Sequence, residues 1–109
     1  MSGLNSARFA EELTYDTSGG TGAYQAFSDV LQENPAMILF DNQSNVAVII
    51  SDDGTTNGKT FVAGEAIVLD LRTNKELTAD DMSWRKLTQF FANSAAGTGF
   101  FRISYVYSS

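Results

Sequence analysis

The sequence contains no cysteine and no histidine. Without cysteine the chain cannot form a disulfide, a thiolate zinc site or an iron–sulfur cluster, and it offers no thiol nucleophile. Without histidine it lacks the most common general base and the most common metal ligand, and a Ser-His-Asp triad is excluded. We therefore expect a protein that is not an enzyme and that holds no cofactor and no metal ion.

Basic residues are also scarce. Seven Lys and Arg residues stand against thirteen Asp and Glu residues, so the formal net charge is -6 at pH 7. Binding to nucleic acid or to an anionic membrane surface depends on clustered positive charge, and we expect neither. The apolar runs are far shorter than the roughly 18 residues of a membrane span, and residues 1–10 show no secretory signal pattern. The protein is expected to fold in the compartment where it is made.

A chain of 109 residues is long enough for one domain with an ordinary hydrophobic core. Its single proline, Pro35, precedes an apolar run, where it removes no hydrogen bond from a sheet. Short β-branched and aromatic segments separated by turn residues predict strands at residues 36–40, 46–50, 59–62, 66–71 and 100–107. Residues 87–91 fit two structures equally well, a strand or the end of a helix that begins near Thr78, so this region is ambiguous. The pattern predicts an all-β fold, either a small antiparallel β-sandwich or a jelly-roll-like barrel.

Alternation along two of these strands indicates which side chains form the core. The inward positions with the clearest pattern are Ile67, Leu69, Ile103 and Tyr105. Two adjacent phenylalanine pairs, at residues 90–91 and 100–101, place their rings on opposite faces of a strand. One ring of each pair is therefore expected to leave the core and to contact a partner subunit.

The loop at residues 52–58 is similar to a calcium-binding loop when it is read from Asp53. Its twelfth position, which should be a bidentate glutamate, is Gly64. The Asp-Gly and Asn-Gly dipeptides in the loop are instead typical of turns in which glycine adopts a positive φ. We therefore expect a hairpin turn and no metal site. The expected turn residues are Asp53, Gly54, Asn57, Gly58 and Gly64.

Three further patterns in the sequence do not predict a functional site. The acidic residues Glu76, Asp80 and Asp81 are expected to lie on a solvated loop. The segment Gly97-Thr98-Gly99 precedes a strand and lacks the third glycine of a dinucleotide-binding loop. The tripeptide Asn42-Gln43-Ser44 matches an N-glycosylation sequon, which we interpret as a chance match because no secretory signal precedes it.

The first 22 residues differ in composition and patterning from the rest of the chain. They are polar and include the turn-prone stretch at residues 17–22, whereas the strand patterns fall after residue 34. We expect residues 1–22 to form an extended N-terminal arm that becomes ordered on a neighbouring subunit, and residues 23–109 to form the sandwich domain. The expected contact residues of the arm are its scattered apolar side chains, Leu4, Phe9, Leu13 and Tyr15.

The segment from Asn34 to Tyr107 resembles a group of small virion structural proteins of tailed bacteriophages. The matching segments, in order, are Asn34-Pro35, Asp41–Val46, Ile50–Gly54, Phe61–Gly64, Leu69–Lys75 and Gly97–Gly99 before the last strand. The resemblance implies an all-β domain without enzymatic activity that is present in many copies and assembles on the capsid, connector or tail. It also implies that the protein is made in the cytoplasm of a bacterial host, forms a homo-oligomer and binds other virion proteins.

One alternative remains open. Small β-sandwiches also serve as carbohydrate- or receptor-binding modules, in which exposed tryptophan or tyrosine rings stack on sugars. Trp84 and the tyrosines of this chain keep that hypothesis open.

Overall fold

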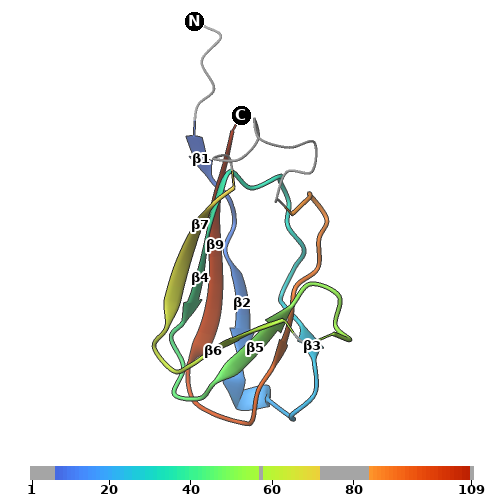
Figure 1. Cartoon of the computed structure of the whole chain (residues 1–109), viewed down its shortest axis with the longest axis vertical. Coiled ribbons are helices and arrows are strands. Elements are labelled where there is room, and N and C mark those ends of the chain that lie inside the picture. Colours follow the sequence, from blue (N-terminus) through green and yellow to red (C-terminus); the bar gives the residue numbers. More distant parts are fainter. Residues whose placement is uncertain (1–6, 57, 72–83, 109) are drawn as a thin grey trace, which may run out of the picture.

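The computed structural model describes residues 7–56, 58–71 and 84–108 and shows a β-sandwich (Figure 1). Within these residues the strands form two antiparallel sheets, and the only helix is one turn of 3-10 helix, η1 (Thr17–Gly19). The strands are β1 (Ala7–Phe9), β2 (Leu13–Asp16), β3 (Gln25–Ala26), β4 (Met37–Asn42), β5 (Val48–Ser51), β6 (Lys59–Phe61), β7 (Ala66–Asp70), β8 (Phe91–Asn93) and β9 (Phe100–Ser108). The predicted all-β sandwich is confirmed.

The first sheet, called sheet A here, is built around β9. One edge of β9 pairs with β4, and the other edge pairs with β1 and then with β2. Strand β7 pairs with β4 and lies at the end of the strand order β1-β9-β4-β7. The second sheet, sheet B, has the order β3-β8-β5-β6. Sequence neighbours such as β4 and β5 therefore lie in different sheets (Figure 1).

The core lies between the two sheets and is rich in aromatic rings. Phe101 contacts Phe61 at 5.1 Å between ring centroids and Phe27 at 5.9 Å, both edge to face. Phe40 and Phe90 form a similar contact at 5.6 Å. Such edge-to-face pairs stabilise a core beyond the area that they bury. The buried apolar side chains are Leu13, Tyr15, Phe27, Leu31, Ile38, Phe40, Val48, Ile50, Phe61, Phe90, Ala92, Phe101, Ile103 and Tyr105.

The predicted strand segments are confirmed, with ends shifted by up to two residues. In the described part of the ambiguous region, residues 84–90 are irregular and lead into β8, so no helix occurs between Trp84 and Phe90. The expected helix start near Thr78 lies outside the described residues. Strands β1, β2 and β3 were not predicted. In each adjacent phenylalanine pair one ring is buried in the core and the other is not, as predicted. Phe90 and Phe101 are buried, whereas Phe91 is half-buried and Phe100 is exposed.

The prediction for core residues is correct for Ile103 and Tyr105, which are 0% and 3% exposed. Ile67 is half-buried against the core, whereas Leu69 is 37% exposed, so its assignment to the core was wrong. Both β7 side chains do face the gap between the sheets, because they pair with the inward residues of β4. Leu69 is nevertheless exposed because β7 is an outermost strand of sheet A, where the gap opens into a pocket.

The structure corrects the interpretation of the N-terminal arm. Leu13 and Tyr15 are 1% and 5% exposed, and both belong to the chain's own core. The Tyr15 hydroxyl forms a hydrogen bond of 2.9 Å with the Ser94 hydroxyl. Because β1 and β2 complete one edge of sheet A, residues 7–22 are part of the sandwich, and the expected boundary between residues 22 and 23 is wrong. Leu4 lies outside the described residues.

Removal of a buried side chain from β9 tests this assignment of the core. Ile103→Ala should lower the free energy of unfolding by about 2–4 kcal/mol, through the lost burial and the cavity that remains. Val106→Ala, on the opposite face of the same strand, should cost much less because Val106 is only half-buried. Urea denaturation of the two variants measures both effects. Equal losses would show that the inward face of β9 is assigned wrongly.

Candidate functional site

Part of the outward face of sheet A is apolar, whereas the outward face of a solvent-exposed sheet is usually polar. Across one line of outward side chains, Val106 of β9 pairs with Phe9 of β1 on one side and with Met37 of β4 on the other. Two residues further along β4, Leu39 pairs with Val68 of β7. Phe9 is 90% exposed, Val68 59% and Met37 42%, while Leu39 and Val106 are half-buried. These five side chains, called the outer apolar face here, line a surface hollow of about 220 Å³.

A polar network borders the outer apolar face further along β9. The Arg102 guanidinium forms an ion pair of 2.8 Å with Glu12, and the Ser104 hydroxyl donates to the other oxygen of that carboxylate at 2.8 Å. Arg102 Nε–H also donates to the side-chain oxygen of Gln43 at 2.9 Å, and Gln43 donates to Asp41 at 2.6 Å. An apolar centre with a hydrogen-bonded border is the usual arrangement of a protein–protein interface.

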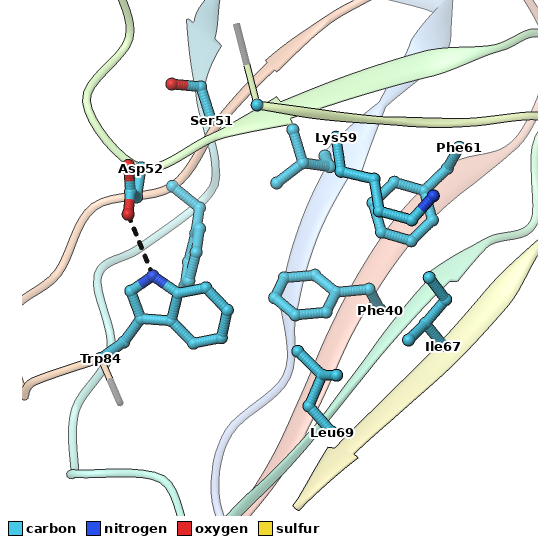
Figure 2. Close-up of a pocket in the computed structure, with 11 residues that line it drawn as sticks. Phe40, Ser51, Asp52, Lys59, Phe61, Ile67, Leu69 and Trp84 are labelled. Atoms are coloured by element: carbon cyan, nitrogen blue, oxygen red, sulfur yellow. Dashed lines mark hydrogen bonds between the residues drawn. The ribbon is translucent and has the colours of Figure 1, made fainter. Parts of the chain in front are cut away.

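A pocket of about 260 Å³ opens between the two sheets beside β7 (Figure 2). Its walls include the aromatic side chains Phe40, Phe61, Phe90 and Trp84 and the aliphatic side chains Ile50, Ile67 and Leu69. The Trp84 indole N–H donates to Asp52 at 3.1 Å, which places the tryptophan ring across one end of the pocket. Trp84 also contacts Phe40 and Phe90 edge to face, at 5.5 and 5.3 Å between centroids.

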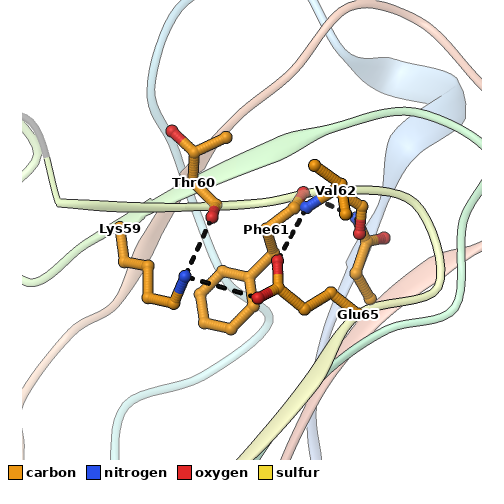
Figure 3. Close-up of polar contacts among 6 residues, drawn as sticks. Lys59, Thr60, Phe61, Val62 and Glu65 are labelled. Atoms are coloured by element: carbon orange, nitrogen blue, oxygen red, sulfur yellow. Dashed lines mark hydrogen bonds and ion pairs between the residues drawn. The ribbon is translucent and has the colours of Figure 1, made fainter.

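Polar contacts hold the other end of the pocket in place (Figure 3). The Lys59 ammonium lies 3.5 Å from the Glu65 carboxylate, donates to the Thr60 carbonyl at 3.2 Å, and sits 4.8 Å from the centre of the Phe61 ring. The second oxygen of Glu65 accepts the Val62 N–H at 3.0 Å. The turn between β6 and β7 thus fixes the Lys59 side chain along the pocket wall.

The Asp53 carboxylate organises the predicted hairpin loop. It accepts the Thr55 and Thr56 N–H groups, each at 2.9 Å, and the hydroxyls of Ser51 and Thr56. These hydrogen bonds hold the pKa of Asp53 well below its usual range, with the Thr56 hydroxyl as the largest cause. Its oxygens thus bond within the loop, and no three carboxylates gather into a metal-binding group in the part of the chain that the structure describes.

The predicted turn glycines have two different physical roles. Gly54 adopts φ +77°, as predicted, and Gly64, predicted as a turn residue, adopts φ +82°. The positive φ expected at Gly58 is wrong, because Gly58 is not among the glycines with positive φ. At Gly58 a Cβ would lie 1.6 Å from the Ile50 carbonyl oxygen, so close approach of two backbones requires glycine there. Asn57 lies outside the described residues, as does the acidic cluster of Glu76, Asp80 and Asp81.

Asn42 of the sequon is a buried structural residue. Its side chain is fully buried, and its amide donates to the carbonyls of Val46, Phe61 and Val62 at 2.9, 3.0 and 3.1 Å. It therefore joins the end of β4 to the segment before β5 and to the end of β6. The Gly97–Gly99 segment leads directly into β9, as predicted, and Gly99 has φ +105°.

The outer apolar face was not predicted, apart from Phe9. A signal was present in the run at residues 36–40, which is apolar at every position rather than at every second one. A strand of this kind is covered on both faces in most proteins. Met37 and Leu39 therefore marked a second apolar face that the sequence interpretation did not use.

Comparison with protein-family models, with curated proteins and with solved structures finds no match in any of the three. Among the described residues there is no helix long and apolar enough to cross a membrane. The outer apolar face and the pocket are the two candidate functional surfaces of the described domain.

Substitutions at Gly54 test the conformation of the hairpin loop. Val should destabilise the protein more than Asn, because β-branched residues tolerate φ near +77° poorly. A Cβ at Gly54 would also lie 3.1 Å from the Phe91 ring, whereas one at Gly64 would meet nothing within 4 Å. Gly54→Ala should therefore cost more than the matched Gly64→Ala. Thermal unfolding of the four variants gives the ranking, and equal costs for Val and Asn at Gly54 would contradict the loop geometry.

The lowered pKa of Asp53 predicts a pH-dependent contribution to stability. A carboxylate with a lowered folded-state pKa stabilises the fold above its unfolded pKa of about 3.9, and this contribution is lost as the pH falls through the folded-state value. Asp53→Asn should therefore be less stable than wild type at pH 7, and the difference should shrink below about pH 4. Urea midpoints measured across this pH range provide the test. A difference that stays constant down to the most acid pH would exclude the carboxylate charge as the cause.

Proposed function

We propose that this protein is a non-enzymatic structural component of a bacteriophage particle, present in many copies and assembled through the outer apolar face of sheet A. The observation that carries the proposal is the register of exposed apolar side chains across strands β1, β9, β4 and β7. The resemblance of residues 34–107 to small virion proteins of tailed phages supports the particle as the setting.

The exposed side chains are sufficient for a contact of ordinary strength. Complete burial of a Val, Met or Phe side chain contributes about 1.5–3 kcal/mol, and Phe9, Met37 and Val68 each retain a large exposed fraction. Loss of translational and rotational freedom on association opposes this gain. In a particle with many copies, several such contacts act together, so each one needs only modest strength.

The carbohydrate-binding alternative gains no support from the positions of its residues. Trp84 is half-buried, hydrogen-bonded to Asp52 and packed against two phenylalanines, so its ring is not an open stacking platform. Tyr15 and Tyr105 are core residues. Trp84, Tyr15 and Tyr105 are thus occupied within the domain, and the other two tyrosines, Tyr24 and Tyr107, are half-buried.

Purified particles of the phage that encodes the chain test the setting. Quantitative mass spectrometry should find the protein as a stoichiometric component that remains after density-gradient purification. A protein that is abundant in the infected cell and absent from purified particles would contradict the proposal.

A pair of matched variants tests the surface. Val68 and Val62 are 59% and 60% exposed, but only Val68 belongs to the outer apolar face. Val68→Asp should reduce incorporation into particles at least tenfold when the variant is supplied to a phage that lacks the gene, because a buried unpaired carboxylate is costly. Val62→Asp should be incorporated like wild type. Equal incorporation of the two variants would exclude the outer apolar face as the contact surface.

A further inference from the structure

The pocket between the sheets is a second site, separate from the outer apolar face. We propose that it binds a single neutral aromatic ring. This proposal does not depend on the proposed function, because the pocket opens between the sheets whereas the outer apolar face lies on the far side of sheet A.

The arrangement of the walls favours an aromatic occupant over an aliphatic one. Phe40 contacts Trp84 and Phe90 with interplanar angles of 73° and 82°, and Trp84 meets Phe90 at 72°. These rings form an edge-to-face cluster at the pocket (Figure 2). An added ring extends the same pattern, in which the positive edge of one ring meets the negative face of another.

The polar groups at the rim favour a neutral occupant. The Asp52 carboxylate accepts the Trp84 N–H, and the Lys59 ammonium is paired with Glu65 and the Thr60 carbonyl. The Ser51 hydroxyl donates to Asp53 and accepts two N–H groups of its own loop. Each of these groups already has a partner within the domain, and most of the pocket lining is apolar, so the pocket offers more contact to a neutral ring than to a charged one.

The size of the pocket sets the size of the ligand. A dry apolar cavity of about 150 Å³ accepts benzene, and typical sites for drug-sized ligands begin near 300 Å³. The pocket volume of about 260 Å³ lies between these values. It therefore fits one ring with a small substituent. Such a ring is supplied either by a free small molecule or by the side chain of a peptide.

Titration of the whole chain with toluene tests the proposal. The chain has a single tryptophan, so the indole N–H signal of Trp84 reports the pocket without ambiguity in an NMR spectrum. Toluene should shift this signal in a saturable way. Methylcyclohexane, which also has a six-membered ring with one methyl group but has no π-system, should bind about two- to tenfold more weakly than toluene. Benzoate should bind more weakly than toluene as well.

A second pair of probes distinguishes the two sources of the ring. Tighter binding of N-acetyl-phenylalaninamide than of toluene would assign the site to a peptide side chain, and the reverse order would assign it to a free aromatic compound. Both outcomes support the binding of a neutral aromatic ring.

A rim variant and its control locate the binding. Leu69 lines the pocket and is 37% exposed, so Leu69→Phe should fill the pocket and weaken toluene binding at least tenfold. Val62→Phe, which adds the same ring at an exposed position away from the pocket, should bind like wild type.

Three results would overturn the proposal. They are no shift of the Trp84 signal up to the solubility limit of toluene, equal or tighter binding of methylcyclohexane or benzoate, and unchanged binding in a folded Leu69→Phe variant. The wild-type titration decides the matter alone if Leu69→Phe does not fold.

Discussion

The pairing of β9 with β4 on one edge and with β1 and β2 on the other is the constraint on which the structure depends. It joins residues near the start of the described chain to residues near its end, as in the pairs Leu13 with Ile103 and Tyr15 with Phe101. The inward side chains of β9, Phe101, Ile103 and Tyr105, are almost completely buried. Loss of this pairing would therefore open sheet A and expose the centre of the core.

The same alternation that builds the core also creates the outer apolar face. Because successive side chains of a strand point to opposite faces, burial of Ile38 and Tyr105 places Met37, Leu39 and Val106 on the outside of sheet A. In most antiparallel sheets these outward positions are polar. Here they are apolar over three neighbouring strands, and β1 adds Phe9 beside them. The chain thus presents a surface like a protein–protein interface, while the inward side chains of the same strands remain buried in its core.

Local sequence patterns were sufficient to predict the strands from β4 onward, except β8, and the turn at Gly54, because alternation and turn dipeptides are properties of neighbouring residues. They were not sufficient for β2, because Leu13 and Tyr15 are buried in a core that forms only when β2 pairs with β9, at Ile103 and Phe101 near the other end of the chain. Leu69 shows the same limit, since its exposure depends on the place of β7 in the strand order. The pocket could not be predicted for the same reason, because Trp84, Phe40 and Lys59 meet only after both sheets have formed.

A reconstruction of the assembled particle at side-chain resolution tests the central claim, that the outer apolar face is the assembly surface, most directly. The account predicts that Phe9, Met37 and Val68 lie against a neighbouring subunit, with the Glu12–Arg102 ion pair at the border of the contact. A particle in which these three side chains face solvent, while sheet B makes the contacts with neighbouring subunits, would contradict it.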